Sequence, residues 1–275
     1  MARPKKTKPA LIQSPKGMHD ILPPDQPLWE KVKKIVKEIA EFYNYARLDT
    51  PILERAELFE RTVGETTDIV EKQMFILNTK GKERLALRPE ATASIARSYI
   101  EHGLSQLGQP LKIFYEGPMF RYEQPQAGRY REFHHVGLEI FSNEDDTFYD
   151  DQVILIFYRL LEALKIKNIS IVINSIGCKN CRASYRKQLQ NYYKNFKNQL
   201  CGDCGRRLDS NPLRILDCKE EQCRELKKEA PIIIDNLCSH CHDHFKMVLG
   251  YLDELSLPYN LDHYLVRGLD YYTKT

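Results

Sequence analysis

Residues 120–139 read Phe-Arg-Tyr-Glu-Gln-Pro-Gln-Ala-Gly-Arg-Tyr-Arg-Glu-Phe-His-His-Val-Gly-Leu-Glu, and this stretch decides the fold. The apolar segments 111–120 and 133–141 flank a polar loop, which is typical of a long antiparallel hairpin. One guanidinium group can bind two phosphate oxygens at once, and a carboxylate can bind an amine. The hairpin therefore indicates a site for a substrate with several phosphates, although a solvent-exposed, salt-bridged ribbon has the same charge content. Its charged residues include Arg121, Glu123, Arg129, Arg131 and Glu139.

The 275 residues are enough for one large domain with an insertion, or for two smaller domains. The 41 basic and 38 acidic residues give a net charge of +3, which neither requires nor excludes a nucleic acid partner. No apolar run approaches the roughly 18 residues of a membrane span. Residues 1–14 begin with a basic, proline-rich stretch that lacks the apolar core of a secretory signal. We expect a disordered basic tail and a cytoplasmic protein without membrane contact.

Hydrophobic periodicity predicts a mixture of helices and strands after this tail. Apolar side chains at three- and four-residue spacing predict a long helix over 25–43, followed by a short strand over 45–50. Further predicted elements are a loop over 64–68, a hairpin of 74–78 with 84–87, helices over 91–101 and 146–164, and a buried strand over 169–174.

The character of the chain changes between residues 175 and 257, where all eight cysteines occur among many Lys, Arg and Asn residues. We interpret 175–257 as an insertion domain, with 15–174 and 258–275 forming the core that it interrupts.

The cysteine spacings are typical of zinc-binding turns, since two thiolates in a Cys-x2-Cys pair can reach one tetrahedral ion. The first two pairs, Cys178/Cys181 and Cys201/Cys204, enclose nineteen residues (182–200), which is close to zinc-ribbon spacing. The remaining cysteines are less regularly spaced, and His240, His242 and His244 could replace some of them as ligands. A cytoplasmic protein is not expected to form four disulfides. Two alternatives to a zinc site are reduced cysteines packed as small apolar side chains, and redox-labile thiols. We expect at least one structural zinc ion, and the spacings do not determine which pairs share it. The less regularly spaced cysteines are Cys218, Cys223, Cys238 and Cys241.

Three blocks in order carry a resemblance to a known family: 87–92 (Leu-Arg-Pro-Glu-Ala-Thr), the hairpin, and 265–272 (Leu-Val-Arg-Gly-Leu-Asp-Tyr-Tyr). From about residue 15 to 275 the chain closely resembles the histidine–tRNA ligases, which are class II aminoacyl-tRNA synthetases. The hairpin is shared across the class, whereas the Arg-Gly-Leu-Asp-Tyr-Tyr block marks the histidine enzymes. The resemblance implies an α+β fold, with a class II synthetase-like antiparallel sheet flanked by helices and a cysteine-rich insertion domain. It also implies a homodimer packed through the first helix and strand, and an insertion that leans over the acceptor stem of tRNA(His).

The resemblance also implies a reaction in two steps. The carboxylate of histidine attacks the α-phosphate of ATP to give histidyl-adenylate and pyrophosphate, and the histidyl group then moves to the terminal ribose of the tRNA. Such chemistry depends on positioning and on neutralising negative charge. The implied catalytic residues are Arg267 and Arg121, both at the α-phosphate. Mg²⁺ would bridge the outer phosphates, and the implied ATP-binding residues are Arg121, Glu123, Arg129 and Phe133.

The resemblance also implies which residues recognise histidine. By resemblance, Glu90 and Thr92 hold its α-ammonium group, Glu139 and Tyr272 hold its imidazole, and Tyr271 lines the pocket. His135 stands where most family members place a glutamine beside the ammonium group. A protonated His135 would repel the substrate, so we expect activity to fall below about pH 6.5. His134 should point to the opposite face of the strand.

Three further expectations concern how much of the family's length this chain covers and which other functions its sequence allows. The resembled family continues with a glycine-rich strand, a third motif and an anticodon-binding domain, so we expect an amino-terminal part with little activity alone. A non-catalytic, histidine-sensing regulatory subunit of ATP phosphoribosyltransferase shares this core, but the intact 267–272 block and hairpin arginines argue against it. The cysteine-rich segment could instead act as a zinc-held RNA-binding module.

Overall fold

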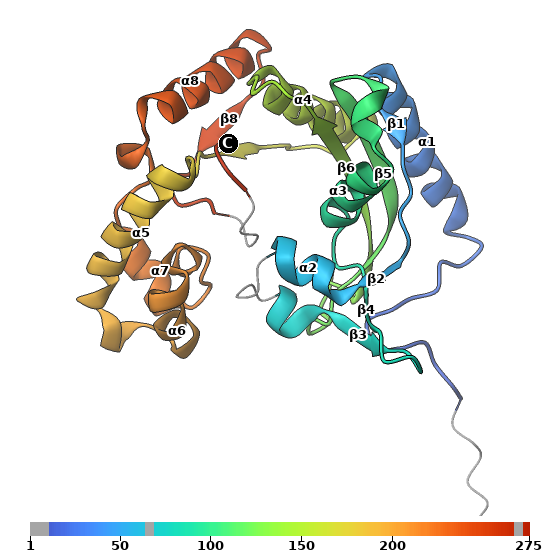
Figure 1. Cartoon of the computed structure of the whole chain (residues 1–275), viewed down its shortest axis with the longest axis horizontal. Coiled ribbons are helices and arrows are strands. Elements are labelled where there is room, and N and C mark those ends of the chain that lie inside the picture. Colours follow the sequence, from blue (N-terminus) through green and yellow to red (C-terminus); the bar gives the residue numbers. More distant parts are fainter. Residues whose placement is uncertain (1–10, 64–68, 267–271) are drawn as a thin grey trace, which may run out of the picture.

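The computed structural model describes residues 11–63, 69–266 and 272–275. The fold is α+β, as predicted, with most of the β-strands in one part and a lobe of helices facing them (Figure 1). Most of the predicted tail, the predicted loop 64–68, Arg267 and Tyr271 lie outside the described residues. In the described part, no helix has both the length and the apolar character that crossing a membrane requires.

The hairpin that decides the fold is formed by β5 (Leu111–Phe120) and β6 (Glu132–Phe141). The two strands pair antiparallel from Leu111↔Phe141 to Phe120↔Glu132, which confirms the predicted hairpin. The short strand β1 (Ala46–Arg47) pairs with β5 in the parallel direction. Because side chains alternate along a strand, this three-stranded sheet has two chemically different faces.

One face of this sheet is covered by α1 (Gln26–Phe42) and α4 (Phe148–Ala163), both close to their predicted bounds. Val36 and Ala40 of α1 and Ile156 of α4 pack around Phe114 in one hydrophobic cluster. His134 lies on this face, where its ring is 4.4 Å from that of Trp29. The prediction that His134 points away from His135 is therefore confirmed.

A second sheet lies at the edge of the first and has the strand order β2-β4-β3. Its antiparallel hairpin confirms the one predicted for 74–78 and 84–87, and α3 follows it as expected. A cluster around Phe59, Ala86 and Ala93 fixes this sheet against α2 and α3. The bounds are β2 (Leu53–Arg55), β3 (Phe75–Asn78), β4 (Arg84–Leu87), α2 (Ala56–Val63), η1 (Ile69–Gln73), α3 (Thr92–Glu101) and η2 (Leu104–Leu107).

The strand predicted over 169–174 forms β7 (Ile171–Ile173), but it is only half-buried, with Val172 47% exposed. It pairs in parallel with β8 (Tyr259–Leu261), and the described strands form three small sheets. A parallel pair needs a long crossover connection, and the residues between β7 and β8 provide it. This connection ends in α8 (Ser239–Glu254), which packs on α4 through a cluster around Phe245 and Leu252.

The rest of the crossover forms the helical lobe, which we define as residues 178–237. The lobe has its own hydrophobic cluster, centred on Tyr185, Leu189 and Leu208. Its bounds are α5 (Lys179–Lys194), η3 (Lys197–Gln199), α6 (Gly202–Ser210), η4 (Pro212–Ile215), α7 (Glu221–Lys227) and η5 (Ile234–Asn236). Because α8 packs on the core, the lobe is shorter than the predicted 175–257 insertion, whose boundaries stay a prediction. After β8 the chain returns to the base of the lobe, where the Lys274 N–H donates to Gly177 O at 3.0 Å.

Candidate active site

The second face of the β5–β6 sheet forms the floor of the candidate site. Along β6 this face carries Phe133, His135, Gly137 and Glu139, which pair across the sheet with residues of β5. Six residues at about 3.4 Å each separate Phe133 from Glu139, so the two ends of the floor lie roughly 20 Å apart. The sheet thus brings the predicted ATP-binding and histidine-binding residues onto one surface, with nucleotide candidates near the loop.

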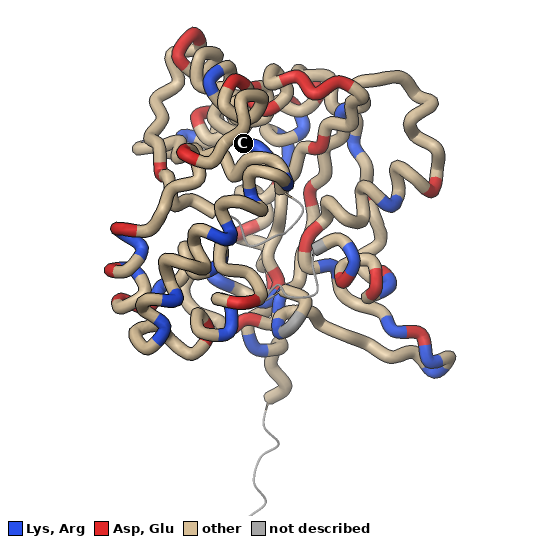
Figure 2. The backbone as a smooth tube through the Cα atoms, turned by 60° about the vertical axis from the view of Figure 1, so that its left-hand side comes forward, with Lys and Arg blue, Asp and Glu red and all other residues tan. Residues whose placement is uncertain are grey.

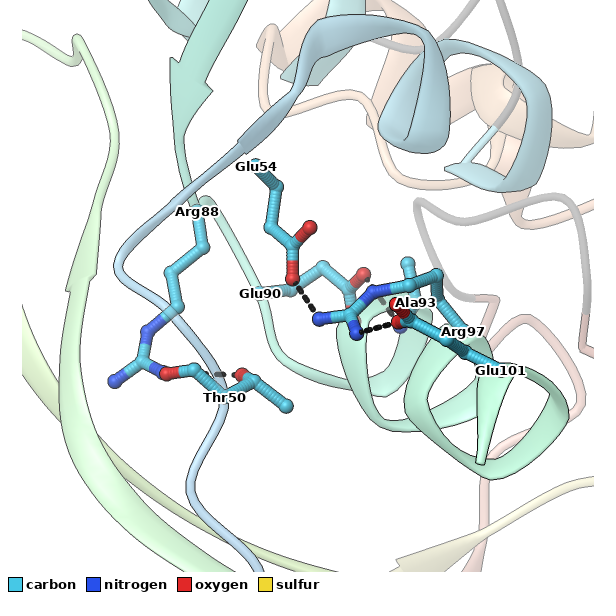
Figure 3. Close-up of polar contacts among 7 residues, drawn as sticks. All are labelled: Thr50, Glu54, Arg88, Glu90, Ala93, Arg97 and Glu101. Carbon is cyan, nitrogen blue, oxygen red and sulfur yellow. Dashed lines mark hydrogen bonds and ion pairs between the residues drawn. The ribbon is translucent and has the colours of Figure 1, made fainter. Parts of the chain in front are cut away.

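Glu90 is buried at the amino end of α3 and caps this helix (Figure 3). Its carboxylate accepts hydrogen bonds from the Thr92 N–H at 2.7 Å and from the Ala93 N–H at 3.0 Å. Burial raises the pKa of Glu90, while these bonds and the charge of Arg121 oppose the rise. The cap fixes the orientation of a carboxylate whose oxygens each keep one further lone pair.

Thr92 links this cap to the second carboxylate of the site. The Thr92 hydroxyl donates to Oε1 of Glu139 at 2.7 Å across 47 positions of sequence. Burial, together with the charge of the nearby Glu90, raises the pKa of Glu139 to about 7, although the Thr92 bond opposes the rise. Two buried carboxylates held this close favour a ligand that brings positive charge or hydrogen-bond donors.

Tyr115 is a site residue that the sequence analysis missed. It pairs with Gly137 across the sheet, and a Cβ atom on Gly137 would lie only 2.1 Å from Cζ of Tyr115. The glycine therefore lets the phenol ring cross the neighbouring strand. Burial raises the pKa of Tyr115, and so do the charges of Glu139, Glu90 and Tyr272. A glycine inside a strand opposite an aromatic residue was the available signal.

Arg88 was also missed, although it stands in the quoted 87–92 block. The side chain is 7% exposed, and its guanidinium donates to Pro118 O at 3.0 Å and to Thr50 O at 2.8 Å (Figure 3). It therefore joins the segment before α3 to β5. This buried fork positions Glu90 from two residues away.

Arg121 and Phe133 lie together toward the loop end of the floor. The Arg121 Nε–H donates to Pro89 O at 2.9 Å, and its guanidinium carbon is 5.2 Å from the centroid of the Phe133 ring. Further along the loop, Arg129 Nε is 3.1 Å from a carboxylate oxygen of Glu123. The predicted nucleotide-binding residues are thus neighbours in two pairs, one stacked and one ionic.

Two further residues predicted to bind histidine, His135 and Tyr272, lie in different surroundings. The ring of His135 lies between those of Phe133 and Tyr115, with centroid distances of 6.3 and 6.0 Å. Tyr272 lines a cavity of about 740 Å³ with residues of α4 and β7.

A cleft of about 590 Å³ separates the hairpin loop from the helical lobe. Glu123 and Arg129 line it from the loop, and Arg207, Arg214 and Lys219 line it from the lobe. Lys and Arg residues also follow the backbone of the lobe, with acidic residues between them (Figure 2). Asp203, Asp217 and Glu220 line it as well, so four basic and four acidic side chains, Glu123 included, face this cleft.

The lobe and the start of α8 bring the eight cysteines into two tetrads. None of the eight is in a disulfide. The zinc-ribbon spacing suggested that Cys201 and Cys204 share a site with Cys178 and Cys181. The tertiary fold instead places other cysteines beside each of these two pairs. In the described part of the chain, the groups of potential metal ligands contain cysteines only. The Nε2 atoms of His240 and His244 instead lie 3.5 and 3.3 Å from carboxylate oxygens of Asp145 and Asp150, respectively. The base tetrad is Cys178, Cys181, Cys238 and Cys241; the tip tetrad is Cys201, Cys204, Cys218 and Cys223.

Comparison with known proteins agrees with this geometry. The family model described as histidyl-tRNA synthetase matches residues 17–189. The histidine–tRNA ligase of Aquifex aeolicus is 48% identical over 264 residues, which are 96% of this chain and 65% of that relative. The apo histidyl-tRNA synthetase of S. aureus has a TM-score of 0.75 at 35% identity, over 96% of this chain and 60% of that one.

A protein of Bacillus halodurans described as an ATP phosphoribosyltransferase regulatory subunit/histidyl-tRNA synthetase has a TM-score of 0.69 at 22% identity, over 97% of this chain and 72% of that one. At this identity the likeness concerns the fold alone. The chain spans 65% of the length of the Aquifex relative. Its matched sequence, its class II fold and its paired carboxylates on the hairpin floor lead to one assignment: the chain belongs to the histidyl-tRNA synthetase family.

Proposed function

We propose that this chain carries the histidine- and ATP-binding site of a histidine–tRNA ligase, which forms histidyl-adenylate and transfers the histidyl group to tRNA(His). The observation that carries the proposal is the link from Glu90 through Thr92 to Glu139. Histidine offers an ammonium group and an imidazole, and each can be met by one of these carboxylates.

In this proposal the two carboxylates have separate roles. Glu90 binds the α-ammonium group, and Glu139 accepts a hydrogen bond from the imidazole. Thr92 orients Glu139 in addition to its predicted contact with the ammonium group. Tyr115, His135, Tyr271 and Tyr272 complete the pocket. A ligand whose side chain lacks the ring nitrogens would leave Glu139 unpaired, at a cost of roughly 1–3 kcal/mol.

The nucleotide would lie toward the hairpin loop. Arg121 contacts the α-phosphate and the substrate carboxylate, and adenine replaces the Arg121 guanidinium over Phe133 or extends its stack. Arg129 and Glu123 exchange their mutual ion pair for an outer phosphate and the adenine amino group. Mg²⁺ bound to the outer phosphates would neutralise part of their charge, and Arg267 serves as the electrophile at the α-phosphate.

The partners of the protein follow from the same proposal. The acceptor end of tRNA(His) would enter the cleft between the loop and the lobe, where the arginines and Lys219 of its lining would contact phosphates. A homodimer is supported by partly exposed apolar side chains on one face of the second sheet, at Leu53 and Leu77. We place the protein in the cytoplasm, where its tRNA partner would be found.

The test is calorimetric titration of the chain with histidine. We expect binding of histidine, weaker binding of histidinol because it lacks the carboxylate, and weaker binding of histidine by Glu139→Gln. The exposed Glu144→Gln is the matched control and should bind as the unaltered chain does. Failure to bind histidine, or equal binding by Glu139→Gln, would contradict the site.

A histidine-dependent exchange of pyrophosphate into ATP then separates a ligase from a histidine sensor. Histidine binding without exchange, in a chain extended to the length of its relatives, would favour the regulatory alternative. The 48% identity to a ligase favours the ligase over this alternative.

A further inference from the structure

We propose that the helical lobe is built on two zinc ions, each bound by four cysteine thiolates, one at the base tetrad and one at the tip tetrad. The inference is independent of the proposed function, because the tetrads lie outside the hairpin floor.

The positions of the sulfur atoms fit a tetrahedral ion. With Zn–S bonds of about 2.3 Å, the edge of a tetrahedron of four sulfurs is about 3.8 Å. The Sγ atoms of Cys178 and Cys181 are 3.5 Å apart, and those of Cys201 and Cys218 are 3.8 Å apart. All ligand atoms of each tetrad lie within 4.8 Å of one another. A disulfide would need a separation near 2.05 Å, so the sulfurs are spaced for a shared ion.

The backbone around the sulfurs already supplies outer contacts. The Cys204 N–H donates to Sγ of Cys201 at 3.4 Å, the Cys201 N–H donates to Sγ of Cys223 at 3.4 Å, and the Cys238 N–H donates to Sγ of Cys181 at 3.1 Å. Such N–H groups stabilise thiolates, and they orient metal ligands in the way that second contacts do in known zinc sites. Each tetrad therefore has its sulfurs held from the main chain.

Helix geometry explains why Cys-x2-Cys pairs occur here three times. Cys178, Cys201 and Cys238 are the N-cap residues of α5, α6 and α8, and the second cysteine of each pair lies in the first turn. The positive end of each helix dipole thus faces two sulfurs. The base tetrad receives two helix ends and the tip tetrad one, which offsets part of the double negative charge of a tetrathiolate zinc centre.

The two sites have different places in the fold. The base tetrad joins the first turn of α5 to the first turn of α8, where the chain enters and leaves the lobe. The tip tetrad ties α6, of nine residues, to α7, of seven, and helices this short are marginal without such a constraint. An ion at the base would fix how the lobe stands on the core, and an ion at the tip would hold its outer helices together.

Gly177 shows how closely the base tetrad is packed. Its backbone has φ +63°, and a Cβ atom there would lie 2.7 Å from Cβ of Cys181 and 2.9 Å from a methyl carbon of Leu237. The same residue accepts the Lys274 N–H. The base tetrad therefore adjoins the described residues 272–275 at Lys274.

Zinc is the ion that this donor set favours. Four thiolates in a tetrahedral arrangement suit zinc or iron, and the fourfold occupation by cysteine leaves no open position for catalysis. Each ion would displace four thiol protons into the buffer, so binding should be lost as the pH falls.

The experiment is metal analysis of the full 275-residue chain, purified without chelator. We expect two zinc ions per chain. Cys241→Ser and Cys223→Ser should each lower the content to one, and the double variant to none. His242→Ala alters an exposed histidine outside both tetrads and should keep two ions.

A second measurement remains decisive if a cysteine variant does not fold. Titration of the unaltered chain with a mercurial reagent should release two zinc ions as eight thiols react, and tetrahedral cobalt–thiolate absorption should appear at two equivalents of Co²⁺. Absence of zinc with eight freely reacting thiols, a stoichiometry of one, or the absorption of an iron–sulfur cluster would each overturn the proposal.

Discussion

Replacing Glu139 by glutamine tests the electrostatics of the site most directly. Burial raises the pKa of Glu139 from 4.5 to about 7, which is a difference of about 2.5 pH units. At about 1.4 kcal/mol per unit, the ionised carboxylate costs the fold on the order of 3 kcal/mol above neutral pH. The native state holds the proton more tightly than the unfolded state, so the unfolding free energy should fall as the pH rises from 4.5 to 7.

Glu139→Gln removes this titration and keeps the acceptor for the Thr92 hydroxyl. The variant should match the unaltered chain near pH 4.5 and exceed its unfolding free energy by up to about 3 kcal/mol at pH 8. The same change should weaken histidine binding by about 10- to 100-fold, because a charge-assisted hydrogen bond contributes roughly 1.5–3 kcal/mol. The ionised Glu139 would thus lower the unfolding free energy while strengthening the binding of histidine.

The assay is urea unfolding followed by circular dichroism at several pH values between 5 and 8. Comparing variants at one pH cancels the titration of all shared groups, and Glu144→Gln serves as the exposed control. Equal dependence of the unfolding free energy on pH in Glu139→Gln and the unaltered chain would refute the reasoning.

Three further predictions concern packing and buried charge. Gly137→Ala should lower stability by about 1–3 kcal/mol in urea unfolding, because its Cβ would collide with Tyr115, whereas Gly250→Ala in α8 meets nothing within 4 Å and should raise stability by about 0.5–1 kcal/mol. Arg88→Lys should cost about 1–3 kcal/mol in the same assay, because an ammonium group cannot reproduce the fork to two carbonyls, and an unchanged midpoint would count against this role. Asp151→Asn should raise the melting temperature at pH 8 more than at pH 5, since burial, followed by the charge of Asp150, raises the pKa of Asp151 to about 7; equal shifts at both pH values would disprove this.

Several features of the fold could be predicted because their signals are local. Alternation along 111–120 and 133–141 fixed the hairpin and its two faces, and three- and four-residue spacing located α1, α3 and α4 to within a few residues. The placement of His134 and His135 on opposite faces followed from the same alternation. The parallel pairing of β1 with β5 and of β7 with β8 did not, since it joins segments far apart in the chain.

The candidate site shows the same division. Residue type and order were enough to select Glu90, Thr92 and Glu139, but the sequence could not show that Thr92 bonds to Glu139 or that Glu90 caps α3. Tyr115 was missed because its role depends on Gly137 in the partner strand. The exposure of a carboxylate, and therefore its pKa, is a property of everything packed around it.

The sequence by itself determined the family, the hairpin and the presence of cysteine pairs able to bind a metal. These features depend on residue identity and on spacings within about twenty positions, which backbone geometry converts directly into local structure. The tertiary structure alone decided which cysteine pairs come together and which carboxylates are buried next to one another. Both depend on contacts between segments tens of residues apart, and only the packing of the whole fold sets those contacts.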